Sequence, residues 1–154
     1  MLGYSAQQTL DYAQALYEKK LVTYPRTDSR YLTEDMAAGL PGLAMDTAAA
    51  FGFRGAIPVH GKQVINSKKV SDHHAILPTQ SVAGADLSSL PVDEVSILRL
   101  IAARLLAAVG EPYRYAETTV QFECAGQTFT ATGKTFREEG WTDVEGCILG
   151  YRAE

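Results

Sequence analysis

The chain has 154 residues, of which 46% are hydrophobic and 21% charged, as is ordinary for a soluble globular protein of one domain or of one domain plus part of another. A net charge of -4 argues against a dedicated non-specific nucleic-acid coat, which would normally be basic. No stretch is long and apolar enough to span a bilayer, and the N-terminal segment lacks the features of a secretory signal. We therefore expect a cytoplasmic protein that has no membrane partner.

The N-terminal residues predict an amphipathic helix from Ser5 to about Lys20. Ser5 and Gln8 have the spacing of a capping box, in which each side chain satisfies a backbone N–H at the start of a helix. Apolar residues recur at steps of three and four, so we expect one apolar face made of Ala6, Leu10, Ala13 and Tyr17. The next segment, "LVTYP" at 21–25, predicts a short extended stretch that ends at the proline.

The region after the first loop predicts short helices and a long irregular segment. Thr33, with two acidic residues after it, predicts the cap of a second helix that runs to about Leu40, where Pro41 and Gly42 would break it. A further short helix is expected through "AMDTAAAF" at 44–51. Residues 52–71 have no sustained period, so they predict mainly loop, with room for one short strand.

The C-terminal half changes from a helical to a strand period. "LPVDEVSILRLIAARLLAAVGEP" at 90–112 predicts the strongest helix of the chain, with Gly110 and Pro112 as its stop. Its apolar stripe consists of Val95, Leu98, Ala102, Leu105 and Val109. Residues 116–124 then alternate between apolar and polar, and Ala125 with Gly126 turns the chain into "QTFTATGK" at 127–134. This pattern predicts a β-hairpin, which on its own is marginally stable and normally joins a larger sheet.

Two features of this half predict no ligand site. "TGKT" at 132–135 resembles the end of a phosphate-binding P-loop, but Thr128 stands where the motif requires a glycine, and the segment lies in the predicted hairpin. Cys124 and Cys147 lack metal-ligand spacing, so we expect them to be small buried apolar residues.

Tyr24 and Arg26 are the first candidates for chemistry. Pro25 disfavours the helical conformation at Tyr24, and side chains two apart in an extended segment project to the same side. A fixed guanidinium favours the phenolate that develops if a tyrosine attacks phosphorus, and it can hold phosphate oxygens in a two-pronged geometry. The structural alternative is that Tyr24 anchors the loop and Arg26 pairs with Asp28.

The histidine pair in "SDHHAILPT" at 71–79 is the second candidate. Adjacent side chains of an extended segment point to opposite sides, so His73 and His74 are poorly placed to chelate one metal. One of them could instead steady a phosphate or help a leaving 3′-oxygen, although a loop histidine can equally be structural or exposed. Cations gather near both motifs: Lys19, Lys20, Arg26 and Arg30 near the first, and Lys62, Lys68 and Lys69 near the second.

Together, "TYPRTDSRYL" at 23–32 and "SDHHAILPT" resemble the type IA DNA topoisomerases, in particular the topoisomerase III branch. The resemblance extends over nearly the whole chain through "YSAQQTLDYAQALYEKKL" at 4–21 and "EEGW" at 138–141. In that family a tyrosine, which falls on Tyr24, attacks a single-stranded DNA phosphate and gives a 5′-phosphotyrosine and a free 3′-hydroxyl. The phosphate-stabilising arginine falls on Arg26, and the first histidine of "HHAI" falls on His73. The resemblance implies DNA-binding or supporting roles for Asp28, Ser29, Arg30, Lys69 and His74.

The resemblance also implies a fold and partners. An α+β chain is expected, in which residues 1–110 form a mainly helical, winged-helix domain like that of the catabolite activator protein, and 111–154 form part of the β-rich arch that is the hinge. The family binds Mg²⁺ in a toprim domain, which nothing here resembles, so we expect a fragment that has no metal site and is inactive alone. Its partners would be single-stranded DNA and the toprim and arch domains of the same polypeptide, and the protein would be a monomer.

Two functions without catalysis stay open at this point. A winged-helix-like module could grip single-stranded DNA while Tyr24 stacks on a base. A structural or interaction domain without a nucleic-acid role would suit the net negative charge. Replacing Tyr24 by phenylalanine separates catalysis from stacking, because phenylalanine keeps the ring and removes only the nucleophilic oxygen.

Overall fold

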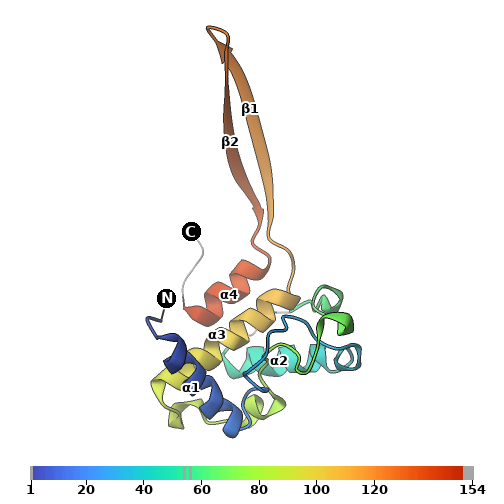
Figure 1. Cartoon of the computed structure of the whole chain (residues 1–154), viewed down its shortest axis with the longest axis vertical. Helices are drawn as coiled ribbons and strands as arrows, with labels where there is room; N and C mark the ends of the chain where they lie inside the picture. The colour runs from blue at the N-terminus through green and yellow to red at the C-terminus, as the bar shows by residue number, and fades with distance from the viewer. Residues whose placement is uncertain (1, 54, 56, 151–154) are drawn as a thin grey trace.

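In the computed structural model, which describes residues 2–53, 55 and 57–150, four α-helices form a body from which one β-hairpin projects (Figure 1). The helices are α1 (Ala6–Glu18), α2 (Leu40–Ala50), α3 (Val92–Val109) and α4 (Trp141–Leu149), and the strands are β1 (Arg114–Cys124) and β2 (Gln127–Glu138). The 3-10 helices are η1 (Glu34–Met36), η2 (Gly61–Gln63), η3 (Ser67–Lys69), η4 (Gln80–Gly84) and η5 (Leu87–Ser89). The expected α+β class is confirmed for these residues. Residues 1, 54, 56 and 151–154 of the two expected domains lie outside them.

Helix α1 begins as its sequence predicts. Ser5 Oγ accepts from the Gln8 backbone N–H at 3.2 Å, and Gln8 Oε1 accepts from the Ser5 backbone N–H at 2.9 Å, so the capping box is confirmed. The expected apolar face is only partly right. Ala13 and Leu16 are the buried residues of α1, whereas Tyr17 is 39% exposed. The Tyr17 ring contacts the loop that follows the helix instead of the core.

Polar side chains hold α1 against the first turn of α3. The Tyr4 hydroxyl donates to Asp93 Oδ1 at 2.6 Å, and the Tyr12 hydroxyl donates to Asp93 Oδ2 at 3.1 Å. These hydrogen bonds to the carboxylate raise the pKa of both phenols above the usual value. Lys19 Nζ lies 2.6 Å from Oε2 of Glu94, which is only 7% exposed. Helix α1 is therefore fixed at both ends.

Helix α2 starts where a break was expected. Pro41 lies in the first turn of α2, which runs without interruption from Leu40 to Ala50, and a 3-10 turn precedes it. A proline is tolerated there because the N–H groups of the first turn have no partner within the helix. The prediction that Pro41 and Gly42 end a helix is therefore wrong, and the two short helices expected around them are one 3-10 turn and one α-helix.

Helix α3 is shared by the two apolar clusters of the body. Ile97 and Leu98 pack with buried residues of α1 and of the segment after it. Leu106 and Val109 pack with buried residues of α2 and α4. The predicted stripe is confirmed, since Leu98, Ala102, Leu105 and Val109 are buried and Val95 is half-buried.

The predicted hairpin is confirmed, and its strands extend beyond the alternating residues 116–124. The two strands pair antiparallel from Cys124↔Gln127 to Arg114↔Glu138. Ala125 and Gly126 have φ values of +50° and +74°, as a tight two-residue turn with right-handed strand twist requires. All strand residues are exposed except Ala116, which is half-buried. The P-loop-like "TGKT" lies inside β2, in a strand context that does not suit nucleotide binding.

The segments that enter and leave the hairpin cross in close contact at its base. Gly140 has φ +52°, and a Cβ there would lie 2.4 Å from the carbonyl oxygen of Pro112 and 2.6 Å from that of Glu111. The Trp141 backbone N–H donates to the Glu111 carbonyl oxygen at 2.8 Å. Only glycine allows the returning strand to approach the outgoing one so closely.

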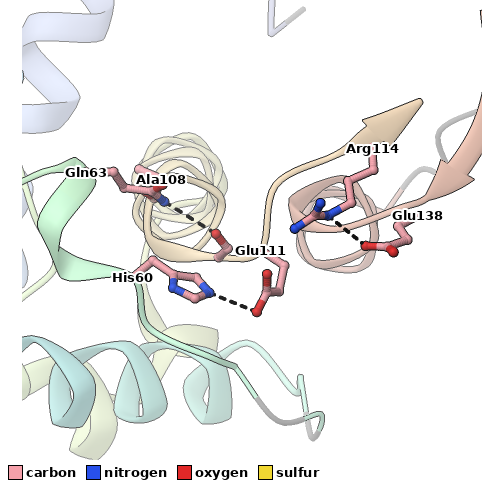
Figure 2. A network of polar contacts seen from close by, with 7 residues as sticks. His60, Gln63, Ala108, Glu111, Arg114 and Glu138 are labelled. Atoms are coloured by element: carbon pink, nitrogen blue, oxygen red, sulfur yellow. Dashed lines mark hydrogen bonds and ion pairs between the residues drawn. The ribbon is translucent and has the colours of Figure 1, made fainter. Parts of the chain in front are cut away.

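A polar network surrounds this crossing (Figure 2). His60 Nε2 lies 2.8 Å from Glu111 Oε1, and Arg114 Nε lies 3.1 Å from Glu138 Oε2. Gln63 donates to a carbonyl oxygen in the last turn of α3 at 2.6 Å. The first and third of these contacts join the loop after α2 to the end of α3 and to Glu111, and the second joins the two strands to each other.

Helix α4 returns the chain from the hairpin to the body. Val144 and Ile148 belong to the same apolar cluster as the C-terminal half of α3. Arg104 Nη1 lies 2.8 Å from Oε1 of the buried Glu145. The segment after the hairpin therefore packs with residues before 110, and the division of the chain into two domains stays a prediction.

Both cysteines differ from expectation. Cys124 at the end of β1 and Cys147 on α4 are free and exposed, so the prediction that they are buried is wrong. Cys124 lies beside the hairpin turn, where no layer covers the strand, and Cys147 lies between the buried residues of α4. None of the described helices is long and apolar enough to cross a bilayer.

Candidate active site

Two segments far apart in the sequence run side by side to build the site. Val22 forms an isolated antiparallel bridge with Pro78. The Thr23 backbone N–H donates to the Leu77 carbonyl oxygen at 2.8 Å, and the Leu77 N–H donates to Thr23 Oγ1 at 2.9 Å. The segment that carries Tyr24 is thereby attached to the segment that follows the histidine pair.

Tyr24 and His73 meet as a result of this pairing. The Tyr24 side chain is half-buried, and its ring centroid lies 4.4 Å from that of His73 with 43° between the planes. The Tyr17 ring of α1 also contacts the Tyr24 ring, in a T-shaped arrangement with 5.5 Å between the centroids and 79° between the planes. Thr27 Oγ1 donates to the His73 carbonyl oxygen at 2.8 Å, which fixes the histidine loop against the tyrosine loop. The structure therefore brings together two of the three residues predicted to be catalytic.

Arg26, Asp28 and Arg30 are exposed on the same loop. Across the described ranges, no ion pair joins Arg26 to Asp28, and no described group is hydrogen-bonded to the Arg26 guanidinium. The structural alternative in which these two side chains pair is therefore not observed. The Arg26 guanidinium is available to an anion two residues from Tyr24.

Ser29 and Lys69 form a separate contact next to this loop. Ser29 Oγ donates to the Lys69 carbonyl oxygen at 2.9 Å, and the Tyr31 backbone N–H donates to Ser29 Oγ at 3.1 Å. Lys69 Nζ lies 4.7 Å from the centroid of the Tyr31 ring and 3.2 Å from its hydroxyl. Lys69 is therefore directed to Tyr31, while Ser29 joins the loop that carries Tyr24 to η3.

His74 has a contact of its own, to the backbone of the next residue. Its Nδ1 lies 2.7 Å from the Ala75 carbonyl oxygen, and because a carbonyl can only accept, Nδ1 carries the proton. Lys19, one of the cations expected around the site, is engaged by Glu94. The positive charge beside Tyr24 is thus smaller than the sequence suggests.

The sequence did not reveal two contacts of the site. Tyr17 was placed in the apolar face of a helix, and nothing in its spacing shows that its ring reaches Tyr24 seven residues later. The sequence predicts no role for Thr27, which stands between Arg26 and Asp28 in the first motif. Its bond to the His73 carbonyl links the two motifs directly.

The side chains that could bind a metal ion are scattered over the described residues. Within residues 2–53, 55 and 57–150, no three side chains of the His, Cys, Asp or Glu type converge as ligands of a metal ion would. The described residues therefore do not fit a Mg²⁺ site, which needs several oxygen ligands in octahedral geometry.

Comparison with known proteins gives this geometry its context. Residues 1–151 match a family model described as DNA topoisomerase. The chain belongs to the type IA DNA topoisomerase family. Within it, the chain is similar to the DNA topoisomerase 3 of Bacillus licheniformis, at 44% identity over 151 residues, and to that of Bacillus subtilis, at 44% over 149 residues. The DNA topoisomerase 3 of Bacillus thuringiensis strain Al Hakam is 36% identical over 153 residues.

These relatives are much longer than the chain. Each match covers 92% of this chain but only 20% of the relative, so the chain spans about a fifth of the length of these topoisomerases. The resemblance of the chain to the topoisomerase III branch is confirmed by these relatives. The roles of individual residues are not tested by the comparison and stay predictions.

Proposed function

We propose that this chain is the catalytic-tyrosine segment of a type IA DNA topoisomerase. The enzyme cleaves single-stranded DNA transiently through a 5′-phosphotyrosine at Tyr24, passes a strand, and reseals the break without ATP. The observation that carries the proposal is the contact between the Tyr24 and His73 rings, at 4.4 Å, beside an arginine that has no partner among the described groups. A nucleophile, a group that can donate a proton and an anion-binding group thus lie on two joined loops.

The cleavage step exchanges one phosphate ester for another. Tyr24 Oη attacks phosphorus, the Oη–P bond forms, and the P–O3′ bond breaks. Arg26 holds the non-bridging oxygens, and His73 donates either a hydrogen bond to the phosphate or a proton to the departing 3′-oxygen. No carboxylate of the described residues is hydrogen-bonded to the Tyr24 hydroxyl, so we place the base that takes the phenolic proton in the toprim domain. Resealing is the reverse reaction, which needs no ATP because the ester bond is conserved.

The neighbouring residues support the site without reacting. The hydrogen bond from Ser29 to the Lys69 carbonyl oxygen attaches the loop of Tyr24 to η3. The His74 ring is hydrogen-bonded to the carbonyl oxygen of the next residue, Ala75. Asp28 and Arg30 are exposed beside Arg26, where Arg30 can contact the phosphates that flank the cleaved one. The substrate in this proposal is single-stranded DNA, whose phosphates would contact the exposed Arg26 and Arg30 on the loop that carries Tyr24.

The rest of the enzyme completes the reaction in this proposal. Mg²⁺ is bound by the toprim domain, and the arch domain carries the exposed hairpin as part of its sheet. The same proposal includes a winged-helix-like arrangement of residues 1–110, a cytoplasmic location and a monomeric state. The isolated chain is inactive on DNA in this proposal, because it lacks the Mg²⁺ and the toprim base that would take the proton of Tyr24.

Cleavage of an end-labelled single-stranded oligonucleotide tests the proposal. The full-length enzyme should cleave it in the presence of Mg²⁺, Tyr24→Phe should not, and the matched Tyr31→Phe control, which removes a hydroxyl from the same loop, should keep cleavage within about threefold. The isolated chain should not cleave. Cleavage by the isolated chain that disappears in Tyr24→Phe would refute its proposed inactivity.

The same variants separate catalysis from simple DNA binding. If Tyr24 only stacks on a base, Tyr24→Phe keeps the ring and the full-length protein retains its affinity and every activity it has. If Tyr24 is the nucleophile, affinity for single-stranded DNA is kept while cleavage is lost. Unchanged activity in Tyr24→Phe would therefore support a binding module and exclude the proposed reaction.

A further inference from the structure

The Tyr24 ring contacts two rings that come from different parts of the chain. His73 contributes one from an exposed loop, and Tyr17 contributes the other from α1. The Tyr17–Tyr24 contact is edge-to-face, with 79° between the planes, which is the arrangement favoured by the quadrupoles of aromatic rings. Since the two side-chain torsions of a tyrosine decide where its oxygen points, contacts on the ring also determine the direction of the phenol.

Core packing does not explain the position of Tyr17. Its side chain is 39% exposed, and no hydrogen bond to its hydroxyl is found among the described residues. The backbone beneath it is fixed, because the Lys19–Glu94 ion pair and the Tyr12–Asp93 hydrogen bond hold α1 to α3. The ring therefore stands on a rigid element and faces the proposed nucleophile.

We infer that Tyr17 is a positioning residue, whose ring contact holds the Tyr24 phenol in the direction needed to attack the phosphate. The inference rests on the proposed function, in which Tyr24 is the nucleophile. It assigns the effect to the ring and not to the hydroxyl. Tyr17 thus acts on the chemical step through Tyr24 and not on the affinity for DNA.

The expected magnitude follows from geometry. In-line displacement at phosphorus requires the attacking oxygen close to the axis of the leaving group, and a misplacement of about 1 Å can cost on the order of 100-fold in rate. Losing one of two ring contacts leaves Tyr24 still held by His73 and by its own backbone. We therefore expect the removal of the Tyr17 ring to slow cleavage by about tenfold, a smaller effect than full misplacement.

Single-turnover cleavage by the full-length enzyme tests this inference. Tyr17→Ala should form the covalent Tyr24 adduct about tenfold more slowly at saturating single-stranded oligonucleotide, with an unchanged dissociation constant for DNA. Tyr17→Phe, which keeps the ring, should match the wild type, and Tyr17→Leu should be as slow as Tyr17→Ala. Alanine is the best helix former, so α1 itself is not weakened. Tyr113→Ala is the control, since Tyr113 is equally exposed, at 39%, and contacts other rings.

The outcomes separate this inference from the function on which it rests. A wild-type enzyme that forms the adduct, with Tyr17→Ala equally fast, overturns the positioning role alone. Weaker DNA binding with an unchanged saturating rate makes Tyr17 a DNA contact and also overturns it, as does a Tyr17→Phe variant as slow as Tyr17→Ala. A wild-type enzyme that forms no adduct at Tyr24 overturns both the function and the inference.

Discussion

Replacing Gly140 by alanine perturbs the point at which the hairpin leaves and rejoins the helical body. A residue with a Cβ at φ +52° and ψ -129° is strained by about 1–3 kcal/mol. The added carbon would also lie 2.4 Å from the Pro112 carbonyl oxygen, closer than real Cβ contacts allow, so the crossing backbones have to separate. Together we expect a loss of about 4 kcal/mol in the free energy of unfolding. For a chain of this size that lowers Tm by roughly 10 °C.

Two other glycines of the hairpin serve as matched controls in thermal unfolding followed by circular dichroism. Gly126→Ala places a Cβ in open space at φ +74°, so it should cost only about 1 kcal/mol for the left-handed backbone. Gly133→Ala has neither strain nor a close neighbour and should be within about 0.5 kcal/mol of the wild type. A Gly140→Ala variant no less stable than Gly126→Ala would refute the close crossing of the two backbones.

Two further predictions concern the contacts between α1 and α3. Lys19→Met leaves the buried Glu94 carboxylate without its cation and should lower the free energy of unfolding by about 2 kcal/mol in urea titrations. In an alkaline absorbance titration, Tyr4 and Tyr12 should ionise above the usual tyrosine range, because their hydrogen bonds to Asp93 raise their pKa. A raised folded pKa means that the stabilisation is fully present below about pH 10 and is lost as the pH rises through the raised values.

Each of these predictions has a variant that can contradict it. Lys68→Met removes an exposed lysine that forms no ion pair within the described residues, so it should be neutral. If Lys19→Met is as stable as Lys68→Met, the ion pair contributes nothing. Asp93→Asn should move the ionisation of Tyr4 and Tyr12 back toward the usual range. An unchanged titration curve in Asp93→Asn would show that the carboxylate is not the cause.

Elements with strong local patterns were predictable from the sequence. The capping box of α1, the stripe of α3 and the alternation that ends at Ala125 and Gly126 each depend on neighbouring residues only. Pro41 was misread because a proline suits both the end of one helix and the first turn of the next, and only the chain that precedes it decides between them. The exposure of Cys124 depends on which surfaces are covered, which no local pattern contains.

The sequence was enough to name the residues of the candidate site, but it did not show which of them touch. Tyr24, Arg26 and His73 stand in motifs that can be read directly, but the ring contact between Tyr24 and His73 requires the pairing of two segments remote in sequence. Tyr17 fitted the helical period and was therefore assigned to the apolar face. Lys19 is one of the cations that the sequence gathers near Tyr24, but it pairs with the buried Glu94 of α3. Both outcomes depend on tertiary contacts that a single helix does not reveal.

The most direct test of the central claim is to identify the residue that becomes linked to DNA. The full-length enzyme is incubated with end-labelled single-stranded DNA and Mg²⁺, denatured and digested, and the DNA-linked peptide is sequenced by mass spectrometry. The account predicts a peptide that spans Leu21 to Arg30 and carries the DNA phosphate on Tyr24. No adduct under conditions where the protein binds DNA, or an adduct at a different residue, would contradict it.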